Sequence, residues 1–142
     1  MFRDPTLVVL SREHFSALAA AAHVEQAGRG ANLEQLRDEL VGLQLPGHFA
    51  AEEQALLPFL SSEHDQRLRI DHAALLDLLE QVQAKCDRTG LDRLAGLLRE
   101  HVRWEERVLF PWLQANLSPS GWSTVAEILA NLQAPFAEEA LP

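Results

Sequence analysis

One thirteen-residue pattern occurs twice in the chain, and it constrains the fold more than any other feature. HFAAEEQALLPFL starts at His48 and HVRWEERVLFPWL starts at His101, so both copies fit H-x3-E-E-x2-L-x-P-x-L. The copies lie 101 − 48 = 53 residues apart, and six of their thirteen positions are identical. Packing of a duplicated helix pair explains the leucines and prolines. It does not explain a recurring histidine and glutamate, because buried ionisable groups need partners.

A weaker repeat connects the segments that precede these two copies. Glu13-His14 and Asp71-His72 are each followed by a leucine four residues after the histidine, and the histidines are 72 − 14 = 58 residues apart. The chain is therefore interpreted as two related units. Each unit supplies one lone histidine and one H-x3-E motif.

Composition and periodicity predict an all-α chain. Leu, Ala, Glu, Gln and Arg are abundant, whereas Val, Ile and Thr are few and Tyr is absent, and this balance favours helices over strands. Ser11, Asn32 and Ser61 are predicted N-caps, Pro46-Gly47 predicts a kink or short break, and Thr89-Gly90 predicts a helix end. The expected helices cover residues 11–27, 32–60, 62–89, 91–115 and 119–132.

Short connections between long helices favour antiparallel neighbours. The expected architecture is thus an up-down-up-down four-helix bundle over about 11–115, with a short extra C-terminal helix over about 119–132 and a frayed tail over 133–142. Residues 1–142 are expected to form a single domain, since 142 residues with 47% apolar content suffice for one core.

Charge and cysteine content narrow the possible partners. With 12 basic and 21 acidic residues the net charge is −9, which disfavours nucleic acid and anionic membranes as partners. No apolar run approaches the length of a bilayer span, and the N-terminus lacks the pattern of a signal peptide. Cys86 is the single cysteine, so no internal disulfide is possible and a reducing cytoplasm is the expected location. Cys86 itself is assigned no role.

The H-x3-E spacing is suited to binding metal ions. Positions four apart lie only about 40° apart around a helix and about 6 Å along it, so each histidine shares a face with its glutamate. If these faces turn inward, two glutamates can bridge two cations while four imidazoles complete the set. Such mixed nitrogen and oxygen ligands suit iron or manganese. The candidate metal ligands are His14, His48, Glu52, His72, His101 and Glu105. The alternative is a metal-free structural bundle with polar core pairs.

These motifs resemble the hemerythrin HHE cation-binding domain over roughly residues 7–115. The resemblance implies an oxo- or hydroxo-bridged di-iron centre, with manganese or zinc as possible substitutes. It implies His14 and His48 on one iron, His72 and His101 on the other, and two bridging carboxylates from Glu52 and Glu105.

One position departs from the family pattern. Oxygen-carrying hemerythrins have a second histidine four residues after the first on the third helix, and here that residue is Leu76. His64 and His23 are poor substitutes by helical geometry. The expected result is a more open pair of irons. Glu53 and Glu106 are interpreted as solvated charges or, alternatively, as partners of the metal ligands.

Three functions are compatible with this sequence. The first is a di-iron protein that binds or senses dioxygen or nitric oxide. The second is a redox enzyme that reduces nitric oxide or peroxide or oxidises ferrous iron, with iron donation or repair as a variant. The third is the metal-free bundle. The residues alone do not distinguish binding from catalysis, because both uses share one ligand set.

Overall fold

The computed structural model describes the backbone of residues 3–140 and the side chains of residues 3–132. All regular elements in this part are helical, as predicted. They are η1 (Pro5–Leu7), α1 (Val8–Gln26), α2 (Leu33–Gly42), α3 (Leu45–Leu56), η2 (Leu57–Phe59), α4 (Ser62–Ala84), α5 (Arg88–Trp104), the π-helix η3 (Glu105–Leu109), α6 (Phe110–Asn116) and α7 (Pro119–Ala140).

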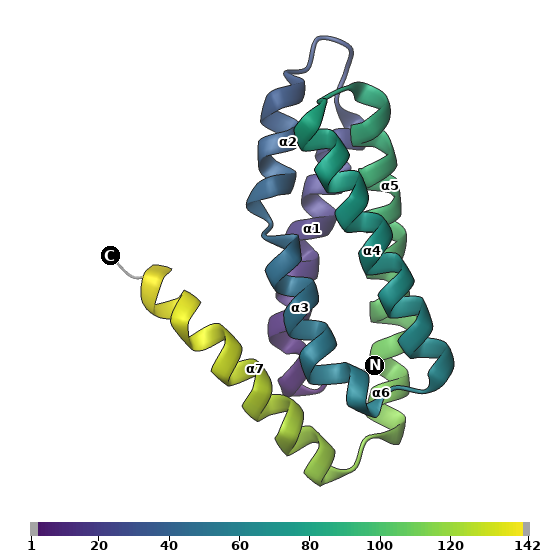
Figure 1. Cartoon of the computed structure of the whole chain (residues 1–142), viewed down its shortest axis with the longest axis vertical. Coiled ribbons are helices and arrows are strands. Elements are labelled where there is room, and N and C mark those ends of the chain that lie inside the picture. Colours follow the sequence, from purple (N-terminus) through teal and green to yellow (C-terminus); the bar gives the residue numbers. More distant parts are fainter. Residues whose placement is uncertain (1–2, 141–142) are drawn as a thin grey trace.

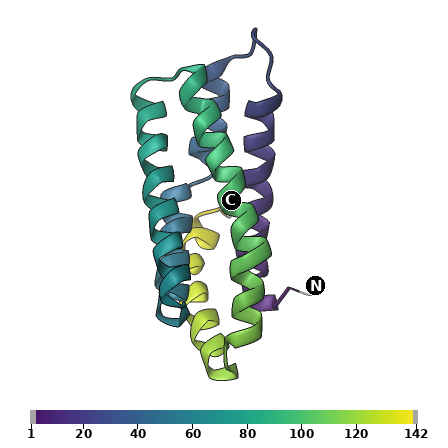
Figure 2. The same cartoon turned by 90° about the vertical axis from the view of Figure 1, so that its right-hand side faces the viewer.

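The helices form a bundle with one projecting arm. In Figures 1 and 2, α1, α2 with α3, α4, and α5 with α6 lie lengthwise beside one another. Helix α5 packs against both α1 and α4, and α7 leaves one end of the bundle at an angle after contacting α3 (Figure 1). None of the helices within residues 3–140 combines the length and hydropathy that a bilayer span requires.

The core consists of two apolar clusters with a polar layer between them. Along α1, Leu10 belongs to one cluster and Ala17 to the other, and His14 lies between them. Along α4, Leu68 and Leu75 flank His72 in the same way. All buried hydrophobic residues among the described side chains belong to these two clusters, so apolar packing flanks the polar layer on both sides.

The predicted break near Pro46-Gly47 is confirmed. Helix α2 ends at Gly42 and α3 begins at Leu45, with Pro46 in its first turn. Between them Gln44 adopts the left-handed conformation, with φ 59° and ψ 42°, which costs a residue with a Cβ atom about 1–2 kcal/mol. Proline fits the first turn of a helix because its missing N–H has no intrahelical partner there. The strain is therefore confined to one residue of the connection.

Replacing Gln44 by glycine is expected to stabilise the protein by about 0.5–1 kcal/mol. Glycine adopts positive φ without steric cost, although its greater freedom in the unfolded chain removes part of the gain. Urea denaturation of the metal-free variant measures the change, and Gly42→Ala, at the end of α2, serves as a comparison in ordinary helical backbone. A lower midpoint for Gln44→Gly would show that the side chain contributes more than its backbone strain costs.

The helix ends agree with the sequence at two of the three predicted caps. The side chains of Asn32 and Ser61 accept backbone hydrogen bonds from Gln35 and His64, as expected of N-caps. The prediction for Ser11 was wrong, because η1 and α1 begin upstream of it and its hydroxyl donates instead to Glu106.

Two other boundaries also differ from prediction. Helix α4 ends at Ala84, before Thr89-Gly90, because the Asp87 side chain accepts a hydrogen bond from the Gly90 N–H and starts α5 at Arg88. The expected tail is helical up to Ala140. Its residues after Pro135 are mostly Ala and Glu, which favour helix, and residues 141–142 lie outside the described residues.

Candidate metal centre

Two glutamates occupy the centre of the polar layer. Glu52 lies on α3, Glu105 is the first residue of η3, and both are fully buried. They are the glutamates of the two repeated H-x3-E motifs. Burying two carboxylates side by side is unfavourable unless positive charge compensates them.

Four imidazoles supply the groups that face these carboxylates. They come from α1, α3, α4 and α5, so each long helical run contributes one. His14, His72 and His101 are 1–3% exposed, and the His48 side chain is 7% exposed. The sequence had singled out these six residues, and the fold brings all of them into one buried layer.

The Nε2 atoms of all four histidines approach a glutamate oxygen. The Nε2 atom of His48 is 2.7 Å from Glu52 Oε1, and that of His101 is 2.5 Å from Glu105 Oε1. The Nε2 atom of His14 is 3.0 Å from Glu105 Oε2. His72 lies between the two carboxylates, with its Nε2 3.7 Å from Glu52 Oε1 and 3.6 Å from Glu105 Oε1.

These close approaches are not hydrogen bonds. The Nε2 atoms of His14, His72 and His101 and all four carboxylate oxygens of Glu52 and Glu105 are buried without a hydrogen-bond partner among the described residues. The contact distances are those of ion pairs, but the groups do not have the directions that hydrogen bonds require. Orphaned donors and acceptors that converge on one region fit cations as the missing partners, because buried polar groups otherwise remain unsatisfied.

The potential ligand atoms form two groups that share the glutamates. One group contains His14, His48, Glu52 and Glu105, and in the other His72 and His101 replace the first two histidines. Within each group one ligand atom per residue lies within 4.8 Å of every other. Two imidazoles and two shared carboxylates per group match a pair of cations with bridging glutamates. The donor set contains no thiolate, so it suits iron or manganese.

Each imidazole is also held from its other nitrogen. The Nδ1 atom of His14 lies 2.7 Å from Glu106 Oε2, and that of His72 lies 3.1 Å from Glu53 Oε2. Glu53 and Glu106 thus follow the buried glutamates in sequence and contact histidines of neighbouring helices. Of the two interpretations of these residues, the structure favours partners of the metal-site histidines over solvated charges.

Glu13 and Asp71 play the same part for the other two histidines, and the sequence interpretation missed them. Glu13 pairs with Nδ1 of His48, and Asp71 Oδ2 lies 2.9 Å from Nδ1 of His101. A carboxylate on Nδ1 fixes the tautomer that presents Nε2 to a metal and raises ligand basicity. The signal was present in the sequence, because an acidic residue precedes both lone histidines.

The charges of the layer keep His14, His48 and His101 protonated in the metal-free protein. Burial is the largest single effect and lowers the pKa of these three imidazoles, but the surrounding carboxylates outweigh it. Glu105 and Glu106 raise the pKa of His14 to about 9. Glu105 and Asp71 raise the pKa of His101 to about 10. Protons therefore occupy the positions that cations would take.

The two glutamates differ in their affinity for protons. Burial and the charge of Glu105 raise the pKa of Glu52. For Glu105 burial acts in the same direction, but the charge of His101 and the close contacts with the imidazoles of His101 and His14 hold its pKa well below the usual value. Glu105 is therefore the principal anion of the metal-free layer.

The position that departs from the family pattern carries no ligand. Leu76 packs against the apolar cluster on its side of the layer. His64 lies against Trp112, with ring centroids 4.8 Å apart, and His23 pairs with Glu39 at the surface. Neither histidine belongs to the two ligand groups, so each group has two imidazoles.

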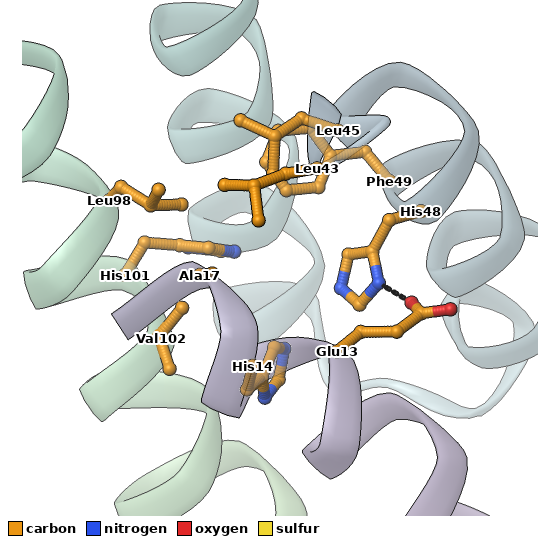
Figure 3. Close-up of a pocket in the computed structure, with 10 residues that line it drawn as sticks. All are labelled: Glu13, His14, Ala17, Leu43, Leu45, His48, Phe49, Leu98, His101 and Val102. Atoms are coloured by element: carbon orange, nitrogen blue, oxygen red, sulfur yellow. Dashed lines mark hydrogen bonds and ion pairs between the residues drawn. The ribbon is translucent and has the colours of Figure 1, made fainter. Parts of the chain in front are cut away.

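A small cavity adjoins the histidines between α1, α3 and α5 (Figure 3). Its volume is about 10 Å³, close to the space that one water molecule needs. The polar lining consists of Glu13, His14, His48 and His101. The apolar lining consists of Ala17, Leu43, Leu45, Phe49, Leu98 and Val102.

The fold and the buried histidines and glutamates define a helical protein with two sets of residues that could bind metal ions. Residues 9–113 match the family model of the hemerythrin HHE cation binding domain. The chain belongs to this family, and it is a hemerythrin-like cation-binding domain. Neither a curated protein nor a solved structure matches the chain.

Proposed function

We propose that the chain holds two iron ions on His14, His48, Glu52, His72, His101 and Glu105, and that this centre binds or senses dioxygen or nitric oxide. The observation that carries the proposal is the set of buried, unpartnered nitrogen and oxygen atoms that converge between two apolar clusters. Iron bound there would supply a redox-active Lewis acid for a diatomic ligand. The proposed arrangement of the surrounding helices is up-down-up-down.

The chain's own residues would orient the centre and restrict access to it. The carboxylates on the Nδ1 atoms turn the imidazoles inward, and the adjoining cavity has room for about one small molecule. Its apolar walls exclude bulk water, which favours a neutral ligand over a charged one. The cytoplasmic location expected from the single cysteine stays a prediction.

A redox enzyme is the second candidate, and Leu76 favours it. Without a histidine at that position each ligand group has two imidazoles and two shared carboxylates. Both cations would then have positions open to exogenous ligands, which an enzyme that reduces nitric oxide or peroxide or oxidises ferrous iron needs more than a carrier does. Mixing the reduced protein anaerobically with each oxidant separates the two candidates, since a stable adduct indicates binding and repeated turnover indicates catalysis.

Protein purified from iron-supplied cells is expected to contain two iron ions per chain and to show ligand-to-metal charge-transfer bands in the near ultraviolet. Elemental analysis and absorption spectroscopy measure both. His23→Ala, which removes a surface histidine, is the control and should keep full iron content. A native protein with substantially less than two metals per chain and no such bands would overturn the di-iron proposal in favour of the metal-free bundle.

A further inference from the structure

Two of the four carboxylates that contact the Nδ1 atoms of the histidines also pair with an arginine. Nη2 of Arg3 lies 3.2 Å from Glu106 Oε1, and Nε of Arg67 donates a hydrogen bond of 2.9 Å to Asp71 Oδ2. The side chains of these two carboxylates are 26% and 11% exposed. Each arginine is therefore one contact away from a histidine of the candidate centre.

The other two carboxylates, Glu13 and Glu53, are not paired with an arginine. Among the residues with described side chains, no lysine or arginine lies within ion-pair distance of either one. Arg69 attracts Glu53 only at longer range and pairs with Asp65 instead. The side chains of Glu13 and Glu53 are 45% and 31% exposed. Because solvent competes for exposed ionic contacts, these two carboxylates constrain their histidines less than the arginine-bound pair does.

Arg3 holds both the side chain and the backbone of Glu106. Its Nη2 atom donates a hydrogen bond of 2.9 Å to the Glu106 carbonyl, and its Nη1 atom donates one of 3.1 Å to Gln114 Oε1. Since Oε1 of Glu106 faces Arg3, the other carboxylate oxygen is left for Nδ1 of His14, at 2.7 Å. The guanidinium also lies 5.4 Å from the centre of the Phe110 ring, which stacks on His14. Arg3 thus contacts two of the groups that enclose this imidazole.

Arg67 makes the same kinds of contact near the other group of ligands. The Asp71 oxygen to which it donates also lies 2.9 Å from Nδ1 of His101. The Arg67 guanidinium lies 4.9 Å from the centre of the Trp104 ring, and that ring is 6.0 Å from the imidazole of His101. Both arginines therefore combine an ion pair to the orienting carboxylate with a contact to an aromatic ring beside the histidine.

The internal repeat does not account for this correspondence. Arg3 precedes η1 and Arg67 lies in α4, 67 − 3 = 64 residues later, whereas the two histidine patterns repeat at 58 and 53 residues. Their target histidines, His14 and His101, belong to different ligand groups. Each group thus contains one histidine whose carboxylate is bound by an arginine, although the two arginines do not occupy equivalent positions of the repeat.

We infer that Arg3 and Arg67 are positioning residues, each of which locks the carboxylate that orients one histidine of a ligand group. A guanidinium holds a carboxylate in a defined direction because its donors are planar and rigid, so Nε2 of His14 and His101 stays aimed at the centre. The remaining histidine of each group depends on a carboxylate that solvent reaches, and it is the ligand that can shift. The consequence for metal binding rests on the proposed function, whereas the fixed orientation of the imidazoles does not.

The fixed orientation is tested without metal by imidazole proton exchange. The Nδ1 protons of His14 and His101 should exchange with solvent about tenfold more slowly than those of the other two ligand histidines, because their carboxylates open less often. Arg3→Gln should accelerate exchange at His14 alone, and Arg67→Gln at His101 alone. Nitrogen-15 NMR of the metal-free protein resolves each imidazole. Equal exchange at all four histidines, or variants that leave it unchanged, would overturn the inference.

The consequence for binding is tested by titration of the metal-free protein with manganese. Arg3→Gln and Arg67→Gln should each weaken one of two manganese ions about tenfold, the lower end of what loss of an outer partner costs, and leave the other ion within about twofold. In a His14→Ala background, where the remaining ion lies on the other ligand group, Arg3→Gln should have no further effect and Arg67→Gln should keep its own. Equal weakening of both ions by either variant would contradict the assignment of one arginine to each group.

Two arginines serve as matched controls. Arg12 lines the same surface pocket as Arg3 without an ion pair among the described residues, and Arg69 pairs with Asp65 on the helix of Arg67. Arg12→Gln and Arg69→Gln should change neither proton exchange nor manganese affinity, and losses equal to those of the two test variants would reduce the effect to general charge. A protein that shows the exchange pattern but binds neither manganese nor iron would refute the proposed function and leave the positioning role intact.

Discussion

Replacing Glu105 by glutamine should eliminate both metal ions rather than one. Glu105 belongs to both ligand groups, and its two oxygens face His14 on one side and His72 and His101 on the other. The neutral amide removes the bridging anion and places an NH₂ group against ligand nitrogens. We expect the affinity for either ion to fall by at least about 100-fold, the upper end of what loss of an outer partner costs.

A comparison with His14→Ala makes this prediction specific to a bridge. His14 belongs to only one group, so its loss should leave up to one ion on the histidines of the other group. Metal content by elemental analysis, with far-ultraviolet circular dichroism to confirm folding, distinguishes the variants. If Glu105→Gln retained two ions, or lost no more than His14→Ala does, Glu105 would not bridge.

The carboxylates that contact the Nδ1 atoms of the histidines should contribute less to metal affinity than Glu105 does. Asp71→Asn should weaken metal binding about 10–100-fold, because Asp71 orients His101 without facing the centre. Asp77→Asn, on the same helix but at the surface, where Asp77 accepts a hydrogen bond from Gln81, is the control. Competition with a chelator measures both affinities. Equal values for the two variants would mean that the contact with His101 does not support the metal.

The sequence predicted the six inward residues because their chemistry is periodic. An H-x3-E spacing fixes which side chains share a helix face, and its repetition at His48 and His101 points to one common site. The same periodicity could not reveal which carboxylate contacts which histidine on a neighbouring helix. That Glu13 contacts His48, and that Glu106 contacts His14, depends on helix packing and rotation, which no local pattern encodes.

Local departures from regular helix were also beyond the sequence. The two motif copies share a proline, yet α3 ends in the 3₁₀ turn that contains Pro58, whereas the helix around Pro111 continues through η3 into α6. Pro111 cannot donate a backbone hydrogen bond, and the bond from the Phe110 N–H to the Glu105 carbonyl widens the preceding turn. Such π-bulges occur frequently at functional sites. Here the bulge begins at one of the two glutamates of the candidate centre.

Metal binding should strengthen as the pH rises, while the metal-free protein becomes less stable. A metal ion takes Nε2 of a neutral imidazole, so it must displace the protons that His14 and His101 retain with pKa values near 9 and 10. Below pH 9 the affinity for each ion should therefore rise by about tenfold per pH unit for the proton displaced from its histidine, and the product of the two affinities by about 100-fold. Calorimetric titration with manganese in two buffers of different ionisation enthalpy measures the protons released.

In the metal-free protein, His14 and His101 make the folded state less stable as the pH rises. Because their pKa values are higher in the folded state, the two histidines stabilise it fully when the pH is below their pKa in the unfolded chain, about 6.5. This stabilisation is lost as the pH rises through about 9 to 10. Ionisation of Glu52, whose pKa burial also raises, adds to the loss. Glu105 has the opposite effect at low pH, because its pKa is lower in the folded state. Its contribution to folding stability is present above its pKa in the unfolded chain, about 4.5, and is lost on acidification.

The melting temperatures of the two forms should therefore diverge with pH. Metal at about 1,000 times its dissociation constant adds about 4 kcal/mol, or roughly 8–16 °C for a chain of this size, and the gap should widen between about pH 6.5 and 8. His23→Ala should not alter it, because His23 pairs with Glu39 at the surface. A gap independent of pH, with no protons released on binding, would mean that His14 and His101 do not hold the metal ions.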